Sequence, residues 1–404
     1  MHIIFVNYHS LACNSGGHIL ALARELSKIG ITVTVFVPFA ANAHIQSSIT
    51  ADGPECLEFS QFNTWLPSNL SSRLKKLIVA WTPRENVRRF VQEIQPQLHC
   101  PYFVHLEDHE YLITATHLGL RLNELLHFSD KKIDSRFTPD LRLSHPKRAP
   151  EFIAKSSGIT ALTQTLTNFA PAGHPNLVFW PGANNEFFKE NTHVNFAKRH
   201  SLHIADNEII LVYPGSVHPM NRAEIRSLYL ATVLLNRHGI PARLVRTGQD
   251  HIPVFDEDPP AISKYIINLG HLPTPKHVAE VLQMANYLVQ PGRSDLFNDY
   301  RFPSKLPEFF ATARPVLLPR SNLGLSVRDG LDAILLQRGD ALEISDILMQ
   351  LISNPSLAKI LSERAGDFAK THFQWPDIAL RVMKFYNTIF QSNQPESNKN
   401  GLEN

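Results

Sequence analysis

The sequence has few of the features that mark metal-binding, secreted or membrane-spanning chains. Its three cysteines, Cys13, Cys56 and Cys100, lie far apart and form neither a CxxC pair nor a cluster with histidine. We therefore expect reduced thiols, a cytoplasmic protein and no structural metal. No stretch reaches the roughly 18 uninterrupted apolar residues that cross a bilayer, so any membrane contact is expected to be peripheral.

The N-terminal segment and the net charge exclude further classes of protein. The apolar run in MHIIFVNYHS stops at Asn7, which is too short for the hydrophobic region of a signal peptide and predicts a first strand. The 39 Lys and Arg residues against 37 Asp and Glu residues leave a formal charge of +2. This balance gives no reason to expect a nucleic-acid partner, and any basic site has to be local.

What the sequence does contain is an alternation of apolar runs and segments of helical period. Its 404 residues, 43% of them hydrophobic, are enough for two domains with substantial cores. A strand over 2–6, a helix over 17–30 and a strand over 31–38 predict a parallel sheet. Further elements of this half are expected as strands at 101–106, 158–163 and 176–180 and a helix near 146–156. The polar, aperiodic stretch 128–150 predicts a mobile loop.

The same alternation restarts at residue 208 and predicts a second α/β domain. Its strands are expected at 208–216, 242–248, 265–273, 286–292 and 314–319, and its helices at 221–238, at 275–285, from about residue 303, and within 341–390. Residues 393–404 lack aromatic and β-branched side chains and predict a disordered tail. Two such domains usually bind a ligand in the cleft between the carboxyl ends of their strands.

A glycine turn follows the first strand, in the segment Asn14–His18. We expect Gly16 and Gly17 to let a ligand phosphate approach the start of the first helix; the alternative is a tight turn with a helix cap. A dinucleotide site requires GxGxxG and an acidic residue at the end of the second strand, where this chain has Val35–Pro38. A nicotinamide or flavin oxidoreductase is therefore disfavoured.

The restart YPGS, the strand end RTG, the turn NLGHLP and the segment QPGRSDLFNDYRFPSKLPEFFATARPVLLP resemble the retaining sugar-nucleotide glycosyltransferases of family 4 (glycosyl transferases group 1). The resemblance implies the α/β GT-B fold, with two facing Rossmann-like domains and a cleft between them. It implies an acceptor-binding domain over 1–184 and a nucleotide-sugar-binding domain over 185–372. The C-terminal helices, 373–392, would cross back to the first domain.

The most specific part of the resemblance is the segment Lys305–Val316. Pro303 suits a first helical turn, which would place Lys305 near the positive helix N-terminus and Glu308 one turn deeper. By resemblance Glu308 is the family's second paired glutamate and accepts hydrogen bonds from the nucleotide ribose, since a carboxylate can accept both hydrogens of a diol. The alternative for Glu308 is an acid on a solvated helix face.

The sequence departs from the family at two places. The first paired glutamate falls at Tyr300, so Asp299 or Asp295 is expected to grip the donor sugar instead. The loop after the restart strand, Gly215–Arg222, lacks the family's arginine and lysine that contact the diphosphate. We expect Arg222, helped by Arg301 and Lys305, to stabilise the diphosphate. Ser216 and Asn221 are the further donor-binding candidates of this loop.

In the first half, polar residues follow the strand at 101–106, where a helix should begin. Relatives carry a histidine near the donor sugar from this domain, which makes His109 the candidate, with Asp108 and Glu107 as alternatives. Asp108 could instead cap the helix.

The resemblance implies transfer of a sugar from a UDP-, GDP- or other nucleoside-diphosphate sugar to a glycan, lipid-linked or small-molecule acceptor, with retention of configuration. No cofactor and no metal are expected, because the chain has no DxD-like pair and no His/Cys ligand spacing. Two other functions stay open. One is a sugar-nucleotide epimerase, and the other is a non-catalytic GT-B-like binding subunit.

Overall fold

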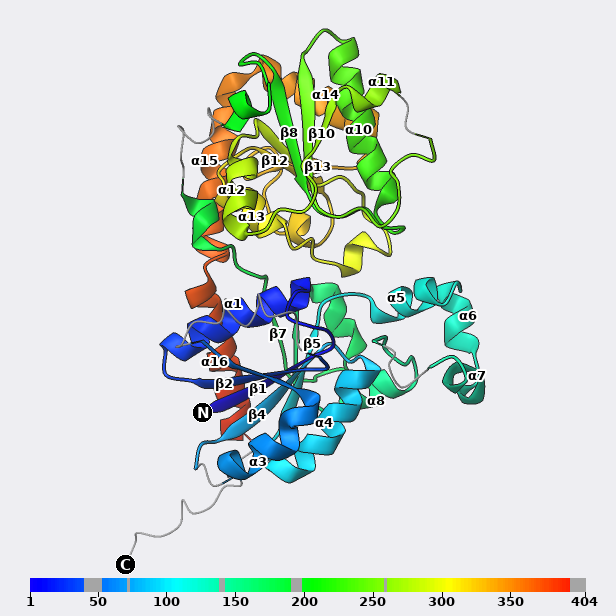
Figure 1. The fold of residues 1–404 in the computed structure, drawn as a ribbon, viewed down its shortest axis with the longest axis vertical. Coiled ribbons are helices and arrows are strands. Elements are labelled where there is room, and N and C mark those ends of the chain that lie inside the picture. Colours follow the sequence, from blue (N-terminus) through cyan, green and yellow to red (C-terminus); the bar gives the residue numbers. More distant parts are fainter. Residues whose placement is uncertain (40–52, 71–72, 138–141, 190–197, 258–259, 393–404) are drawn as a thin grey trace, which may run out of the picture. The chain divides into compact units, whose positions relative to one another are not determined.

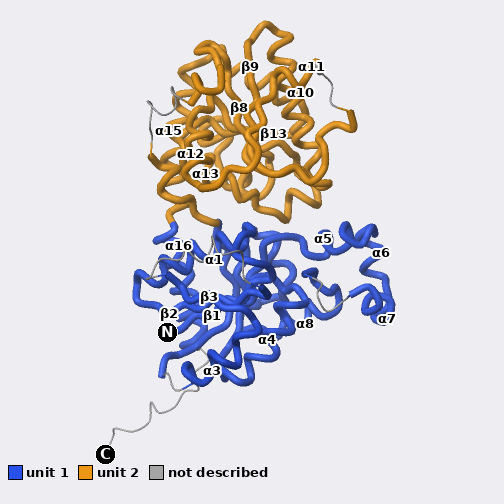
Figure 2. The backbone as a smooth tube through the Cα atoms, viewed as in Figure 1, with its two compact units in different colours: residues 1–180, 375–404 blue, residues 181–374 orange. Residues whose placement is uncertain are grey.

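The computed structural model describes residues 1–39, 53–70, 73–137, 142–189, 198–257 and 260–392. The expected tail at 393–404 lies outside these residues. The chain forms two compact units, residues 1–180 with 375–404 and residues 181–374, which we call unit 1 and unit 2 (Figure 2). The sequence placed the corresponding boundaries after residues 184 and 372.

Unit 1 is built around a parallel sheet of seven strands in the order β3-β2-β1-β4-β5-β6-β7 (Figure 1). The inner strands are almost fully buried, which parallel sheets covered on both faces require. The strands are β1 (His2–Asn7), β2 (Thr32–Val37), β3 (Glu55–Glu58), β4 (Lys76–Trp81), β5 (Tyr102–Leu106), β6 (Ile159–Ala161) and β7 (Asn176–Val178).

The helices of unit 1 come from both ends of the chain. They are α1 (Asn14–Lys28), α3 (Phe62–Leu70), α4 (Glu85–Leu98), α5 (Glu110–His117), α6 (Leu122–His127), α7 (Asp130–Asp134), α8 (Arg148–Ala154) and α16 (Trp375–Ser392). The last helix, α16, packs along α1: Val382 and Tyr386 share one apolar core with Ile19 and Leu22. The C-terminal helix therefore completes the core of the first unit.

Unit 2 repeats the same plan with six parallel strands in the order β10-β9-β8-β11-β12-β13. The strands are β8 (Ile209–Pro214), β9 (Ala242–Thr247), β10 (Ile266–Asn268), β11 (Tyr287–Val289), β12 (Val316–Pro319) and β13 (Ile334–Leu336). The helices are α10 (Arg222–Arg237), α11 (Pro260–Ser263), α12 (Pro275–Gln283), α13 (Leu306–Ala311), α14 (Ala341–Ser353) and α15 (Pro355–His372).

In each sheet the strand order reverses once, between β1 and β4 in unit 1 and between β8 and β11 in unit 2. Loops on the two sides of such a reversal leave the sheet in opposite directions and open a crevice at the carboxyl ends of the strands. Each unit therefore offers one preferred place for a ligand. The predicted α/β class, with parallel sheets in both halves, is confirmed.

The expected mobile loop at 128–150 is wrong for much of its length. The segment contains α7 and the start of α8, and Ser144 and His145 are buried. The helix α8 lies within the one expected near 146–156, whereas α7 has only five residues, too few to show a helical period. Polar contacts link α7 to α8 and α8 to α4.

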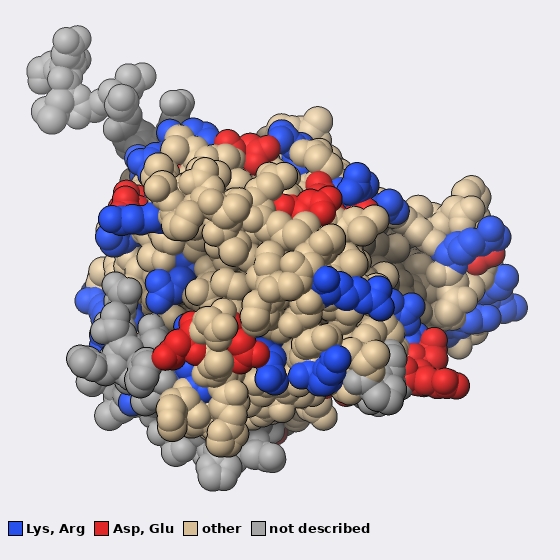
Figure 3. Space-filling view, turned by 90° about the horizontal axis from the view of Figure 1, so that it is seen from above, with Lys and Arg blue, Asp and Glu red and all other residues tan. Residues whose placement is uncertain are grey.

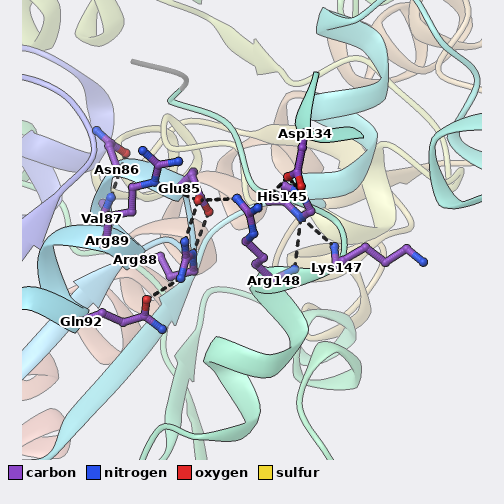
Figure 4. A network of polar contacts seen from close by, with 10 residues as sticks. All are labelled: Glu85, Asn86, Val87, Arg88, Arg89, Gln92, Asp134, His145, Lys147 and Arg148. Atoms are coloured by element: carbon purple, nitrogen blue, oxygen red, sulfur yellow. Dashed lines mark hydrogen bonds and ion pairs between the residues drawn. The ribbon is translucent and has the colours of Figure 1, made fainter. Parts of the chain in front are cut away.

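Those contacts centre on Glu85, which lies at the start of α4 and is almost fully buried. Figure 4 shows its carboxylate among arginines: Nη2 of Arg88 lies 2.6 Å from Oε1, and Arg148 from α8 donates from 3.0 Å. Arg148 also contacts Asp134 of α7 at 2.6 Å. Burial opposes ionisation, but the arginines outweigh it and lower the pKa of Glu85 to about 2.

Because the pKa of Glu85 is lowered, we expect the contact between α8 and α4 to weaken at acidic pH. The stabilisation by Glu85 is complete above the usual glutamate pKa of 4.5 and is lost as pH falls toward 2. Glu85→Gln is expected to cost about 2 kcal/mol at pH 7, with the difference from wild type vanishing toward pH 2. Thermal unfolding as a function of pH measures it. Glu93→Gln, an exposed acid of the same helix, is the control and should show no such pH dependence.

Candidate functional site

Lys305 lies at the strand reversal of unit 2. It precedes α13, and its Nζ is 3.3 Å from the Tyr213 hydroxyl at the end of β8 and 3.3 Å from Oε1 of Gln290 after β11. The ammonium also lies 4.7 Å from the centre of the Tyr213 ring. Both partners are neutral, so the positive charge of Lys305 has no counter-ion among these contacts and is available to an anion.

The backbone around Gly215 leaves room for that ammonium. Gly215 has φ 140°, and a Cβ added there would lie 3.2 Å from Cε of Lys305. The buried Arg246 guanidinium donates to the Gly215 carbonyl from 3.0 Å and is held by Asp250 at 2.8 Å. Asp250 also accepts from Val217 N–H. These hydrogen bonds hold the loop after β8 in one conformation. A site that binds an anion without rearrangement requires such a fixed loop.

The other loop candidates have different roles in the structure. Asn221 is buried and folds the loop on itself, since its side chain donates to the Ser216 carbonyl from 3.0 Å and accepts from His218 N–H at 2.9 Å. The N–H of Ser216 makes no hydrogen bond within the described residues. Ser216 therefore presents a free donor beside Gly215, whereas Asn221 positions the loop.

His218 is a residue of this loop that sequence reasoning missed. Burial, followed by the charges of Arg301, Lys305 and His251, lowers the pKa of His218 to about 4. The charges of Arg301 and Lys305 add to the effect of burial, so both cations lie near this loop. The pair His218–Pro219 did not mark His218 as a candidate in the sequence, because the chain has 20 histidines.

The three expected cations do not behave alike. Arg301 donates to Glu224 on α10 from 2.8 Å, lies over the Phe297 ring and contributes to the field at His218. Arg222 instead pairs with Asp256 at 2.5 Å and donates to the Val254 carbonyl. Lys305 and Arg301 therefore share one neighbourhood, while Arg222 is engaged by the segment after β9.

Asp295 and Asp299, which were expected to replace the missing glutamate, accept hydrogen bonds from residues close to them in the sequence. Asp295 accepts from Phe297 N–H and Asn298 N–H, which shapes the turn before Tyr300. Asp299 accepts from the Ser294 hydroxyl at 3.0 Å. Glu224, which sequence reasoning missed because it lies some 75 positions earlier, is the acid that the structure brings to Arg301 and Asn298. The role of Asp299 stays a prediction.

Glu308 lies on α13, which begins at Leu306 rather than near Pro303. Lys305 is therefore the N-cap residue, and Glu308 lies in the first turn. Burial raises the pKa of Glu308 to about 8, against the opposing charge of Lys305. No hydrogen bond to its carboxyl is found within the described residues. The carboxyl is an unused acceptor beside a cation.

The raised pKa makes a prediction for the ligand-free protein. The contribution of Glu308 to stability is complete below the usual pKa of 4.5 and is lost as pH rises through about 8. Glu308→Gln is expected to gain on the order of 2 kcal/mol over wild type between pH 6 and pH 9. Urea unfolding at the two pH values measures this difference. In Glu257→Gln, which alters an exposed acid of unit 2, the difference should be absent.

The glycine turn of unit 1 is used internally. Gly16 N–H donates to the Cys13 sulfur, which caps α1, and Gly17 N–H donates to the Cys13 carbonyl at 3.0 Å. A Cβ on Gly16 would lie 2.5 Å from the Leu11 carbonyl oxygen, so the turn needs glycine for packing. Binding of a phosphate by these two glycines stays a prediction, and their N–H groups already have acceptors.

Glu107 is the centre of a buried polar cluster at the strand reversal of unit 1. Its carboxylate accepts from the Ser15 hydroxyl, from Nε1 of Trp81 at 2.9 Å and from Nδ1 of His18 at 3.2 Å. These residues follow β1, end β4 and follow β5. Burial opposes ionisation, but the hydrogen bonds and charges of His18, His105 and Ser15 lower the pKa of Glu107 to about 2.

His109, rather than Asp108, caps α5: its Nδ1 accepts from Leu112 N–H at 3.2 Å. Its ring packs edge-on against Phe169 and Tyr111. Burial lowers the pKa of His109, which favours the neutral imidazole. Asp108 lines a small cavity with Tyr111 and Phe169. Contact of His109 or Asp108 with a donor sugar stays a prediction.

Neither a metal site nor a membrane span is found in the described parts of the chain. No three His, Cys, Asp or Glu side chains gather there as ligands. No helix among the described residues has both the length and the apolar character to cross a bilayer. On the face drawn in Figure 3, basic and acidic side chains are interspersed, with no broad area of one sign.

Comparison with known proteins identifies the fold. No family model matches the chain. An uncharacterised glycosyltransferase of Methanocaldococcus jannaschii is 29% identical over 113 residues, which span 28% of this chain and 30% of the relative's length. Anabaena HepE in complex with UDP has a TM-score of 0.68 at 14% identity, over 96% of this chain and 100% of that one. Sucrose-phosphate synthase of Thermosynechococcus elongatus also gives 0.68, at 12% identity over 97% and 100%.

At these identities the likeness concerns the fold. The chain has the GT-B fold, with two Rossmann-like units and parallel sheets, as the sequence predicted.

Proposed function

We propose that the protein is a glycosyltransferase that takes a nucleoside-diphosphate sugar as donor and transfers the sugar to an acceptor hydroxyl. The observation that carries this proposal is the ammonium of Lys305, placed at the β8/β11 reversal without a carboxylate partner in its contacts. A fixed cation at this place stabilises a diphosphate that leaves with its charge. HepE, which shares the fold, has been crystallised with UDP and with UDP-glucose.

The groups around Lys305 suit the parts of such a donor. The free N–H of Ser216 and the charge of Arg301 add to the positive field that a diphosphate would meet. The unused carboxyl of Glu308, one turn into α13, suits the two hydroxyls of a ribose. We propose that this set binds UDP or GDP, with Arg222 assisting once it leaves Asp256.

The reaction follows from this arrangement. The bond between the anomeric carbon and the diphosphate oxygen breaks through an oxocarbenium-like transition state, and the cations take up the developing negative charge. We propose that no metal is needed, because Lys305 and Arg301 supply that charge. Retention at the anomeric carbon is proposed from the family resemblance, and NMR of the product's anomeric proton tests it.

The acceptor is proposed to be a glycan end, a lipid-linked sugar or a small molecule, used by a cytoplasmic enzyme whose membrane contact, where present, is peripheral. Cationic neutralisation of the diphosphate needs neither a nicotinamide nor a flavin.

The test is a screen of UDP- and GDP-sugars with the purified protein and EDTA. We expect one donor to raise the melting temperature and to be hydrolysed slowly to free nucleoside diphosphate. Conversion of the donor into an isomeric nucleotide sugar, without release of diphosphate, would instead identify an epimerase. Binding without turnover in the presence of acceptor mixtures would identify the non-catalytic subunit that Tyr300 favours, since it leaves the first acid position without a carboxylate.

A further inference from the structure

Unit 2 has a cavity at the amino ends of its strands, opposite the edge where Lys305 lies. Its volume of about 430 Å³ suits a small organic molecule rather than a single ion. The wall includes Asn286 and Tyr287 at the start of β11, Arg314 before β12 and Lys359 on α15. All of the described residues that line the cavity belong to unit 2, so the site does not depend on unit 1.

The charged groups on this wall have one sign. Arg199, Arg314 and Lys359 line the cavity, and none of the described residues that line it is acidic. The whole chain is nearly balanced, with 39 basic and 37 acidic residues, so three cations without an acid are a local excess. A hollow lined by charges of one sign concentrates ligands of the opposite sign, and this cavity therefore favours an anion.

Arg199 has no carboxylate within ion-pair distance in the described part of the chain. Its Nη2 donates to the Glu208 carbonyl from 2.7 Å and to Oδ1 of Asn286 from 3.1 Å, and both acceptors are neutral. Its Nε is buried without an acceptor among the described residues. The Glu208 carboxylate pairs with Arg243 at 2.8 Å instead. Burial outweighs the attraction of Asp206 and Glu208 and lowers the pKa of Arg199, which still carries its charge.

Two neutral donors lie on the same wall. The side-chain oxygen of Asn286 accepts from Arg199 and from Ile210 N–H at 2.8 Å, which fixes the amide, while its NH₂ group has no acceptor among the described residues. The hydroxyl of Tyr287 makes no hydrogen bond within the described residues either. Tyr287 is only 6% exposed, and a tyrosine buried so deeply usually keeps its hydroxyl paired. The cavity thus presents a guanidinium, an amide and a hydroxyl as donors.

We propose that this cavity binds a small phosphate monoester, at a site separate from the one around Lys305. A phosphate monoester carries about two negative charges at neutral pH, and its three terminal oxygens accept hydrogen bonds from several directions. Groups at Arg199, on β11 and on α15 surround the ligand, which suits a tetrahedral phosphate more than a planar carboxylate. Met284 and Ala285 give the wall an apolar part, against which the carbon skeleton of the ester would lie.

This inference does not rest on the proposed function. A ligand held by Arg199, by β11 and by α15 joins parts of unit 2 that are far apart in the sequence. Because the ligand binds the folded chain and not the unfolded one, it should raise the melting temperature.

The experiment measures binding of inorganic phosphate and of glycerol 3-phosphate to the full chain, by calorimetric titration and by melting temperature. Both anions should bind, whereas glycerol, and sodium chloride at equal ionic strength, should have no effect. Tyr287→Phe removes only a hydroxyl that no described residue uses, so the fold should keep its stability while the dissociation constant rises about tenfold. Arg199→Gln should raise the dissociation constant about 10- to 100-fold.

Lys359→Gln and Lys370→Gln form a matched pair. Both lysines are exposed on α15, and each lies 3.9 Å from an acid of the same helix, but only Lys359 lines the cavity. Lys359→Gln should weaken binding of glycerol 3-phosphate about three- to fivefold, and Lys370→Gln should leave it unchanged. Lys305→Met should also keep this binding, because Lys305 lies at the opposite edge of the sheet.

Loss of binding in Lys305→Met, with normal binding in Arg199→Gln and Tyr287→Phe, would place the anion at the strand reversal and overturn the inference. The inference also falls when neither phosphate nor glycerol 3-phosphate binds the wild type, or when Arg199→Gln and Tyr287→Phe bind them as tightly as the wild type does. A failed screen of nucleotide sugars would contradict the proposed function and leave these results unaffected.

Discussion

Replacing Lys305 with methionine is expected to lower kcat/KM for the donor by about 10²- to 10³-fold. Methionine keeps the length and most of the volume of the side chain, so packing against Gly215 and Tyr213 persists while the charge is lost. The largest share of the effect should fall on kcat, because charge on the diphosphate grows as the glycosidic bond breaks. Steady-state kinetics with the donor identified in the screen measure both constants.

Lys276→Met is the matched control for this experiment. Lys276 lies on α12 in the same unit and is exposed, so its loss changes the net charge equally without touching the strand reversal. Activity of Lys305→Met within twofold of wild type would remove the observation on which the proposed function depends. A comparable loss in Lys276→Met would point to long-range charge instead of a local site.

Gly248→Ala is expected to cost about 3–5 kcal/mol of folding stability and to abolish donor binding. Gly248 follows β9 with φ 115°, and its added Cβ would lie 2.6 Å from the carbonyl carbon of Gly215 and 2.9 Å from Ser216 N. The clash involves only backbone, which no rotamer can relieve. Displacing Gly215 would also move the loop that borders Lys305, so stability and binding should fall together.

Gly239→Ala separates the cost of a positive φ from the cost of the backbone clash. Gly239 also has a positive φ, 78°, but an added Cβ meets nothing within 4 Å. This variant should lose only about 1–2 kcal/mol of folding stability, which is the cost of alanine at a positive φ, and should bind the donor normally. Chemical unfolding and calorimetric titration with UDP measure both properties. Similar stability in the two alanine variants would show that the loop after β8 can move away from Gly248.

The regular elements of unit 2 were predictable because each has a local signal. Asn221 and Gly239 bracket a helical period, and α10 runs from Arg222 to Arg237. Alternation of strands with such helices fixes a parallel sheet, and right-handed crossovers leave few strand orders. The helix α7 was not predictable, since it has only five residues and its ion pair with Arg148 forms only in the fold, whereas α8 lies within the helix expected near 146–156.

The candidate site was predictable only where one motif carries it. Lys305 and Glu308 belong to a single segment, so the resemblance found both. The partners of Arg301 and of His18 could not be found in this way, because Glu224 lies 77 positions before Arg301 and Glu107 lies 89 positions after His18. Only the folded sheet brings such residues together. The sequence alone does not show whether a carboxylate is buried with a partner or exposed to water.

The position of α16 sets an order of events during synthesis. Unit 2 is one uninterrupted stretch, so all of its strands have been synthesised by residue 374, whereas the apolar side of α1 lacks the cover of Val382 and Tyr386 until the final helix is made. The part of the chain made first is therefore finished last. Until then its uncovered apolar face is where a nascent chain would recruit chaperones.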